Sequence, residues 1–318
     1  MKVVVTGGAG FIGANLCRAL IASGRVTEVV ALDDLSTGDR GNLAGVEAQL
    51  VEGSILDRAV LDDTFAGAAA VVHLAARPSV PRSLADPMAS HLANATGTLE
   101  VLEAARRAGG PHVIAASSSS VYGANPTIPK TEDLATVPLS PYAASKLATE
   151  GYVVAYQHSF AMPTLAFRFF NVFGPLQAPG HAYAAVVPAF VDAALAGHPL
   201  TVHGDGRQSR DFTYVGTVAA VLTRAVVDTV TSPSPVNLAF GSRTDLLSVI
   251  ALLEQLLGHP VEVDHVAPRT GDVRHSQADD TLLRSLFADL EPVDLATGLQ
   301  ATIDWLRSTG AYPDPPTG

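Results

Sequence analysis

The chain has 318 residues, of which 47% are hydrophobic and 16% are charged, and its formal net charge is −11. This length and apolar content predict a globular protein with a large buried core arranged in two lobes. The negative charge disfavours nucleic acid as a partner, and no apolar run approaches the roughly 20 residues that span a membrane.

The single cysteine, Cys17, excludes an internal disulfide. It falls inside a predicted helix, so we interpret it as a small buried hydrophobic residue rather than a reactive thiol. The ten histidines show no ligand spacing with cysteine or glutamate, so no metal site is predicted. The N-terminus runs directly into an apolar segment without a leader pattern, and we expect a cytoplasmic protein.

Short apolar segments alternate with amphipathic ones through the first half of the chain. Apolar and β-branched runs predict strands at Lys2–Thr6, Val29–Leu32, Ala48–Glu52, Ala70–His73, Pro111–Ala116 and Pro163–Phe167. Helical spacing predicts helices at Ile12–Ser23, Met88–Ala108 and Tyr142–His158. This alternation predicts an α/β fold with a Rossmann-type, doubly wound parallel sheet that is covered by helices on both faces.

After about residue 170 the pattern loosens into clusters of proline and glycine, which predicts a smaller α/β C-terminal substrate lobe. The helical segment Val215–Val230 and the apolar segment Val236–Leu238 are expected to return to the first sheet. We therefore expect a dinucleotide-binding domain of residues 1–169 and 214–240, and a substrate-binding domain of residues 170–213 and 241–318.

A glycine-rich turn joins the first strand to the first helix. Gly7 permits a tight turn, Gly10 lets backbone amides approach a pyrophosphate, and Gly13 lets the helix pack closely on the strand. Asp33 ends the second strand, about 20 residues beyond Gly13, where it would bind the ribose hydroxyls of a dinucleotide. Asp34 adds to the repulsion of a 2′-phosphate, so the sequence predicts NAD rather than NADP as the cofactor.

Tyr142 and Lys146 lie four residues apart at the start of the third predicted helix, so their side chains share one face. An ammonium group beside a phenol favours the phenolate. We therefore expect Lys146 and a positive nicotinamide ring to lower the pKa of Tyr142 from about 10 towards neutrality.

The serine run at residues 117–120 begins at the carboxyl end of a predicted strand, where ligands bind in doubly wound sheets. A hydroxyl there would hydrogen-bond the oxygen that Tyr142 deprotonates.

The glycine motif, the serine run, the Tyr142/Lys146 pair and the segment 168–175 (RFFNVFGP) together resemble extended short-chain dehydrogenases and, more closely, UDP-hexose 4-epimerases. The second lobe matches at segments 204–212 and 269–273, so the resemblance covers essentially the whole chain. It implies the catalytic residues Ser118, Tyr142 and Lys146, with Tyr142 as acid and base and Lys146 holding the nicotinamide ribose. It also implies redox-neutral C4 epimerisation of a UDP-sugar through a 4-keto intermediate.

The resemblance implies two sets of binding residues. The NAD contacts are Gly7, Gly10, Phe11, Ile12, Gly13, Asp33, Asp34, Ser36, Thr37, Gly38, Ser54, Ile55, Leu74, Ala75, Ala76, Asn94, Ser117, Tyr142, Lys146 and Phe170. The substrate contacts are Ser79, Arg82, Ser118, Tyr142, Asn171, Val186, Val187, Thr201, Val202, His203, Arg210, Arg269, Asp272 and Ser276. Arg210 and Arg269 match residues that grip the diphosphate. Ser54 replaces a usual aspartate, so its contact with adenine is expected to be weaker or displaced.

Three other functions stay open. A nucleotide-sugar 4,6-dehydratase or a UDP-glucuronate decarboxylase begins with the same oxidation, but related enzymes carry carboxyl groups where Ser119 and Ser120 stand. A non-catalytic NAD-binding sensor would not need a set of proton-transfer residues. The sequence favours the epimerase over all three.

A few residues bear on the identity of the hexose and on the assembly of the protein. Ser276 matches a position where epimerases of N-acetylated sugars carry a small residue, which predicts a roomy pocket near C2. Arg77 and Arg82 would meet a 6-carboxylate if the substrate were a uronic acid, although a solvated loop is the simpler interpretation. The resemblance also implies a homodimer through the helices Met88–Ala108 and Tyr142–His158.

Overall fold

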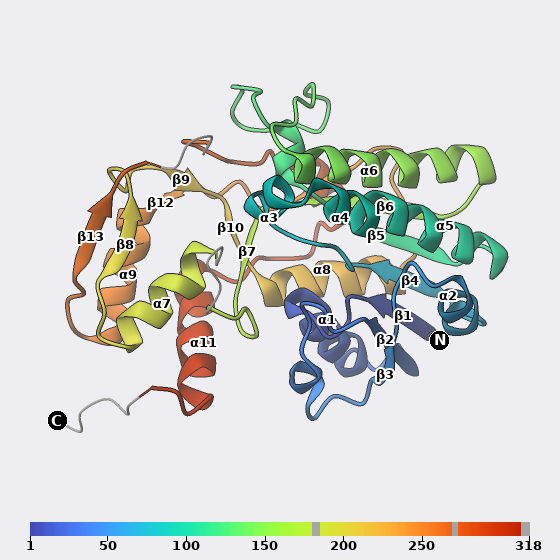
Figure 1. The fold of residues 1–318 in the computed structure, drawn as a ribbon, viewed down its shortest axis with the longest axis horizontal. Helices are drawn as coiled ribbons and strands as arrows, with labels where there is room; N and C mark the ends of the chain where they lie inside the picture. The colour runs from blue at the N-terminus through green and yellow to red at the C-terminus, as the bar shows by residue number, and fades with distance from the viewer. Residues whose placement is uncertain (180–184, 269–272, 313–318) are drawn as a thin grey trace.

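The computed structural model describes residues 1–179, 185–268 and 273–312. Seven parallel strands form its main sheet (Figure 1), in the order β11-β6-β5-β4-β1-β2-β3. These strands are β1 (Lys2–Thr6), β2 (Glu28–Asp33), β3 (Gln49–Glu52), β4 (Ala70–His73), β5 (His112–Ser118), β6 (Thr164–Phe169) and β11 (Val236–Leu238). The strand order reverses between β1 and β4, which places a ligand-binding crevice at their carboxyl ends.

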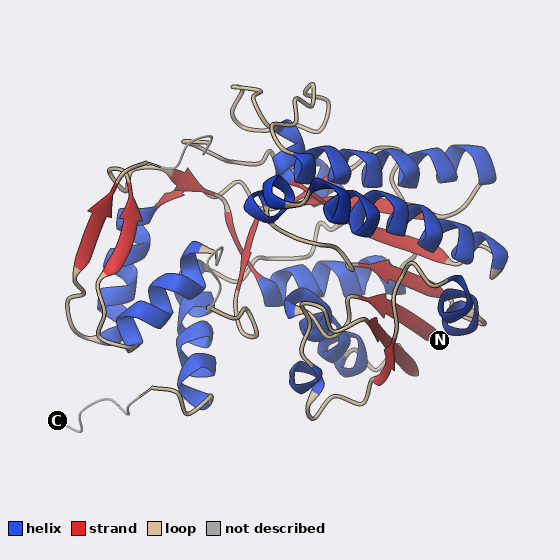
Figure 2. Cartoon of the chain, in the orientation of Figure 1, coloured by secondary structure: helices blue, strands red, loops and turns tan. Residues whose placement is uncertain are grey.

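Helices cover both faces of this sheet (Figure 2). Helices α1 (Phe11–Ala22) and α8 (Val215–Val227) lie on one face. The other face carries α2 (Arg58–Phe65), α5 (Gly97–Arg107) and α6 (Pro141–Phe160). The short helices α3 (Val80–Ala85) and α4 (Pro87–His91) lie beside α6 near the carboxyl ends of the strands.

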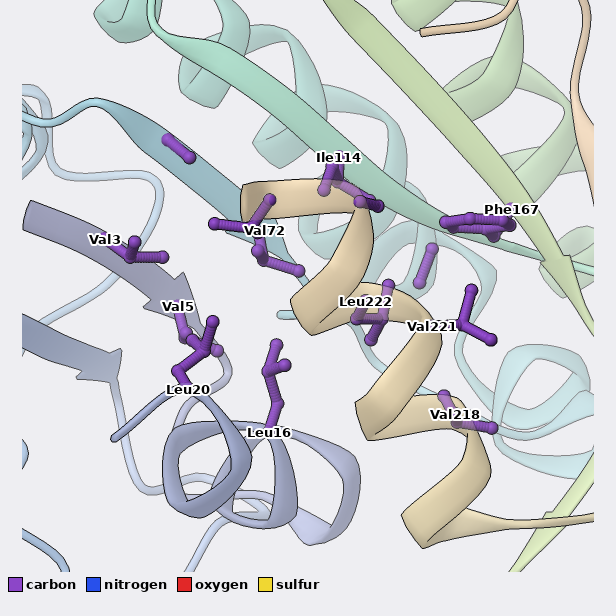
Figure 3. Packing of buried hydrophobic residues seen from close by; sticks show 14 of the residues in the cluster. Val3, Val5, Leu16, Leu20, Val72, Ile114, Phe167, Val218, Val221 and Leu222 are labelled. Carbon is purple, nitrogen blue, oxygen red and sulfur yellow. The ribbon is translucent and has the colours of Figure 1, made fainter. Parts of the chain in front are cut away.

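The sequence of β1 explains why the sheet is covered twice. Val3 and Val5 pack with the first core cluster beneath α1 and α8 (Figure 3), whereas Val4 packs with the cluster on the opposite face. All three side chains are fully buried. Because successive strand residues point to opposite faces, an uninterrupted valine run stabilises a two-sided sheet, and each fully buried side chain contributes roughly 1.5–3 kcal/mol.

The predicted elements of the first half are confirmed, with one difference. Val236–Leu238 forms the edge strand β11 beside β6, as expected. The expected single helix Met88–Ala108 is interrupted: α4 and α5 flank a π-helical segment, Leu92–Thr96. Such segments often occur at functional sites, and this one contains Asn94. Cys17 is buried, and burial raises the pKa of its thiol to about 12, as an unreactive core residue requires.

The second lobe has its own core between α7 (Val186–Leu195), α9 (Leu246–Leu257) and α11 (Leu295–Ser308). Three strand pairs connect its loops: β7 (Asn171–Phe173) with β10 (Phe212–Tyr214), β8 (Leu200–His203) with β13 (Val263–Val266), and β9 (Ser209–Arg210) with β12 (Thr244–Asp245). Helix α10 (Thr281–Leu286) packs beside β11. Across the described ranges, no helix is both long enough and apolar enough to cross a bilayer.

Candidate active site

The glycine turn lies at the carboxyl end of β1 and begins α1. Gly7 adopts a positive φ of 69°, and a Cβ on it would lie 2.7 Å from the backbone nitrogen of Ala75. A Cβ on Gly13 would lie only 2.0 Å from the carbonyl oxygen of Gly7. Gly10 differs, because the carbonyl oxygen of Gly7 is the one described atom near its added Cβ, at 3.2 Å. The turn is therefore closed behind Gly7 and Gly13 and open in front of Gly10, which fits a dinucleotide pyrophosphate at the N-terminus of α1.

We expect Gly13→Ala to destabilise the protein by about 1–3 kcal/mol, because the new methyl group would overlap backbone that cannot move aside cheaply. The variant should also lose NAD binding. Gly151→Ala is the matched control, since a Cβ on this exposed glycine of α6 meets nothing within 4 Å. It should stabilise the protein by about 0.5–1 kcal/mol. Denaturant unfolding measures both effects, and equal stability of the two variants would contradict the packing described.

Asp33 lies directly beside this turn. Its carboxylate accepts hydrogen bonds from the backbone amides of Ala9 at 3.0 Å and Leu35 at 2.9 Å. Burial raises the pKa of Asp33, and these backbone hydrogen bonds oppose the shift. A Cβ on Gly38 would lie 2.8 Å from the same carboxylate. Each carboxylate oxygen retains a lone pair for a ribose hydroxyl, as the sequence predicts for an NAD site.

The remaining candidate cofactor residues surround the same end of the sheet. Phe11 and Ile12 begin α1. The backbone amides of Leu74 and Ala75 donate hydrogen bonds to the carbonyl and hydroxyl oxygens of Thr6, respectively. The Asp34 carboxylate is held by Ser36, whose hydroxyl lies 2.6 Å away. Of the others, Thr37 is exposed, whereas Ile55, Asn94 and Phe170 are buried.

A chain of buried polar side chains connects the glycine turn to α6. Thr6 Oγ1 lies 2.8 Å from His73 Nδ1, and His73 Nε2 lies 3.1 Å from Thr98 Oγ1. Burial and the nearby charge of Lys146 lower the pKa of His73 to about 3, so this histidine stays neutral. The Asn94 amide bonds the backbone of Arg77 and the hydroxyl of Ser145. The π segment thus fixes the loop that leads to Ser79, whose φ is +93°.

The structure brings Ser118, Tyr142 and Lys146 together. Ser118 ends β5 and lies near enough to the phenol of Tyr142, on the first turn of α6, to lower the pKa of that phenol. Ser140 caps this helix through the Ala143 amide at 3.1 Å, and Pro141 occupies its first position. Lys146 is buried, and its Nζ donates to the carbonyl oxygen of Ala116 at 2.8 Å.

The titration of the pair differs from the sequence-based prediction. Burial raises the pKa of Tyr142, and the hydrogen bond from Ser118 only partly opposes it. The pKa of Tyr142 therefore lies above its usual value in the protein without cofactor, and the expected lowering by Lys146 and a nicotinamide ring stays a prediction for the NAD-bound protein. Burial of the ammonium group lowers the pKa of Lys146 to about 8. Desolvation, which disfavours both charged forms, sets the direction of both shifts.

The candidate substrate residues lie in several parts of the fold. Arg210 and Ser276 lie together, because the Ser276 amide and Arg210 Nη1 both bond the Ser209 carbonyl at 3.0 Å. Asn171 Nδ2 bonds the Asp211 carbonyl at 3.4 Å, and the Arg82 amide lies 3.5 Å from Ser79 Oγ. Val187 and Val202 are fully buried in the second core, so only their backbone can face a ligand. Arg269 and Asp272 lie outside the described residues, while Val186 begins α7 and Thr201 and His203 lie on β8.

Sequence reasoning missed one buried charged group behind this site. Glu150 follows Lys146 by four residues on α6, and both of its carboxylate oxygens bond Arg168 of β6, at 2.8 and 3.0 Å. The hydroxyl of Ser117, a predicted NAD contact, lies 3.0 Å from Glu150 Oε2. The repeat of Tyr142, Lys146 and Glu150 at spacing four was the available signal.

Comparison with known proteins agrees with this geometry. Residues 3–239 match the NAD dependent epimerase/dehydratase family. A UDP-glucose 4-epimerase of Mycolicibacterium smegmatis is 37% identical over 315 residues, covering 97% of this chain and 99% of the relative. The structure of a UDP-N-acetylglucosamine 4-epimerase from Methanobrevibacter ruminantium superposes with a TM-score of 0.90 at 34% identity, covering 97% of this chain and 98% of that one. A dTDP-glucose 4,6-dehydratase from Streptomyces venezuelae superposes with a TM-score of 0.87 at 31% identity, covering 97% of each chain.

The seven-stranded parallel sheet, the glycine turn and the Tyr142/Lys146 pair define an extended short-chain dehydrogenase. Within that class, the chain belongs to the NAD dependent epimerase/dehydratase family. The family contains both reaction types named above, so the choice between them depends on the site.

Proposed function

We propose that the protein is an NAD-dependent 4-epimerase of a UDP-sugar. The contact of Ser118 with Tyr142, beside the buried Lys146, carries this proposal, because it presents one phenol and one hydroxyl to a single sugar oxygen. NAD held by the glycine turn and Asp33 would accept the hydride from C4 and return it to the opposite face. Tyr142 would take the proton of the 4-hydroxyl and give it back, and Lys146 would bind the nicotinamide ribose.

The residues after Ser118 favour epimerisation over elimination of water. Ser119 and Ser120 form the short 3₁₀ turn that follows β5, where related dehydratases carry an acid pair. The aliphatic hydroxyl of serine, unlike a phenol or a carboxyl group, is a poor general acid or base near neutral pH, because it holds its proton far too tightly. The serines at this position therefore support epimerisation rather than elimination of water.

The nucleotide must stay bound while the hexose turns between the two hydride transfers. We assign the diphosphate to Arg210 together with Arg269, and the uridine ribose to Asp272. Arg210 is oriented by the carbonyl oxygens of Ser209 and Arg274, at 3.0 and 3.2 Å. Tight nucleotide binding and looser sugar binding would permit the rotation without release.

Two features bear on the hexose. Ser276 is small and lies beside Arg210, which favours space for a substituent at C2. The guanidinium of Arg77 lies 3.6 Å from the Asp86 carboxylate, so a uronic acid would have to compete with this ion pair. We therefore favour glucose or an N-acetylated analogue over glucuronate.

The second proposed partner is another copy of the chain. Apolar side chains are exposed along α3, α4 and the π segment, at Leu84, Met88 and Leu92, and along α6 at Tyr152 and Phe160. Helices α4 and α6 lie side by side (Figure 1). This face would supply two helices per subunit to a four-helix homodimer interface.

Incubation with UDP-glucose, UDP-glucuronate, UDP-N-acetylglucosamine and dTDP-glucose, followed by product analysis, tests the assignment. The proposal predicts a C4 epimer of at least one UDP-sugar and release of NAD on denaturation. A 4-keto-6-deoxy product would establish a dehydratase instead, and binding without any product would favour the sensor.

A further inference from the structure

Three consecutive residues of β5 contact three residues of α6 that are spaced four apart. Ser118 lies near enough to the Tyr142 phenol to lower its pKa, and the Ala116 carbonyl accepts from Lys146 Nζ at 2.8 Å. Between them, Ser117 Oγ lies 3.0 Å from Glu150 Oε2 and 3.3 Å from the Lys146 carbonyl oxygen. The Tyr142, Lys146 and Glu150 side chains share one helix face, so these contacts together fix where α6 sits along β5.

Glu150 and Arg168 form the buried anchor of this arrangement. Their side chains are only 4% and 5% exposed, and the two carboxylate oxygens accept from Arg168 Nη2 and Nε in a bidentate pair. Removing two charges from water costs free energy that their attraction only roughly offsets, and two apolar residues of similar size often stabilise a fold as well. Stability alone therefore does not explain an ion pair directly behind the catalytic residues.

Arg168 also connects the anchor to the substrate side of the fold. Its Nη1 donates to the Glu132 carbonyl at 3.1 Å, and its guanidinium lies 4.7 Å from the centre of the Tyr122 ring. The Tyr122 hydroxyl in turn bonds Asn237 Oδ1 at 2.6 Å. Asn237 Nδ2 reaches the Lys130 carbonyl at 2.8 Å, and the Lys130 amide bonds the carbonyl of Gln277, the neighbour of Ser276.

We propose that Glu150, held by Arg168, is a positioning residue that acts through Ser117 to keep the Tyr142 phenol within reach of Ser118. The inference rests on the proposed function, since it concerns the geometry of the same proton transfer. A displacement of about 1 Å in a reacting group can reduce the rate about 100-fold. Glu150 itself contacts neither substrate nor cofactor in this arrangement.

Two variants test the role of the anchor. The double substitution Glu150→Leu/Arg168→Met replaces the buried pair with apolar groups that permit folding, and Ser117→Ala removes only the connecting hydroxyl. We expect kcat to fall about 10- to 100-fold in the double variant and about 3- to 10-fold in Ser117→Ala, with KM for the UDP-sugar within about threefold. The control is Asp62→Leu/Arg107→Met, which removes an exposed ion pair of 2.6 Å on the same face of the sheet, and its kcat should not change.

A second readout does not depend on turnover. The ultraviolet absorbance of the Tyr142 phenolate, taken as the difference between each variant and the same variant with Tyr142→Phe, gives the titration of this phenol in the holoenzyme. We expect Tyr142 to titrate at higher pH in both anchor variants, because the hydrogen bond that lowers its pKa is weakened. If the wild type converts no nucleotide sugar, the proposed function fails, and this titration still tests the positioning role.

Wild-type kcat and wild-type Tyr142 titration in a folded double variant would overturn the inference, since the pair would then be merely structural. If the double variant does not fold, Ser117→Ala decides the question by the same two measurements. A lowered kcat with an unchanged titration would also overturn it, because the effect would not pass through the phenol.

Discussion

Tyr142→Phe should lower kcat about 1,000-fold while leaving the affinity for the nucleotide sugar within about threefold of the wild type. The phenol lies beside Ser118 at the carboxyl end of β5, and its hydroxyl is the group assigned to the proton. The variant keeps the ring and its packing, so only proton transfer is removed. Steady-state turnover and titration calorimetry with the UDP-sugar measure the two quantities separately.

Tyr152→Phe is the matched control. Tyr152 lies on the same helix and is 38% exposed, so loss of its hydroxyl should leave kcat unchanged. Turnover of Tyr142→Phe within about tenfold of the wild type would show that another group carries the proton.

Lys146→Met should lower kcat strongly and stabilise the cofactor-free protein. Burial lowers the pKa of Lys146 from 10.5 to about 8, and such a shift corresponds to about 3 kcal/mol of destabilisation while the group is charged in both states. Part of the gain is offset because the Ala116 carbonyl loses its donor. We therefore expect the free energy of unfolding at pH 7 to rise by about 1–3 kcal/mol, with a kcat at least about 100-fold lower.

The pH dependence gives this second prediction a definite sign. Between pH about 8 and 10.5 the unfolded wild-type chain binds more protons at Lys146 than the folded chain does, so wild-type stability rises with pH across this window. The difference in the free energy of unfolding between Lys146→Met and the wild type should therefore shrink as the pH rises through this window. Denaturant unfolding at several pH values checks it, and an advantage that is absent at pH 7 or grows with pH would contradict the burial of a charged ammonium group.

Much of the fold could be predicted because the apolar residues follow the strand and helix periodicities closely. The valine run of β1 predicts a two-sided parallel strand, and the turn of Gly7 and Gly13 predicts the helix that follows it. The π segment at Leu92–Thr96 could not be predicted, because it depends on the bonds of Asn94 to Arg77 and Ser145, far away in the sequence. The loops of the second lobe could not be predicted either, because their course depends on short pairs of strands that are far apart in the sequence.

The site shows the same division. Local spacing predicts the pair Tyr142 and Lys146, and the resemblance adds Ser118; the structure brings the three together. The rise in the pKa of Tyr142 in the protein without cofactor could not be predicted, because spacing reveals neighbours but not the depth of burial. Arg168 is part of a recognised segment, yet its pairing with Glu150 appears only in three dimensions.

The fate of the hydrogen at C4 tests the central claim most directly. UDP-glucose, UDP-glucuronate and UDP-N-acetylglucosamine, each deuterated at C4, would be converted in ordinary water and the products examined by NMR and mass spectrometry. Epimerisation predicts a product of inverted C4 configuration that keeps the deuterium at C4. Migration of the deuterium to C6 with loss of water, or its loss to solvent, would contradict the proposed reaction.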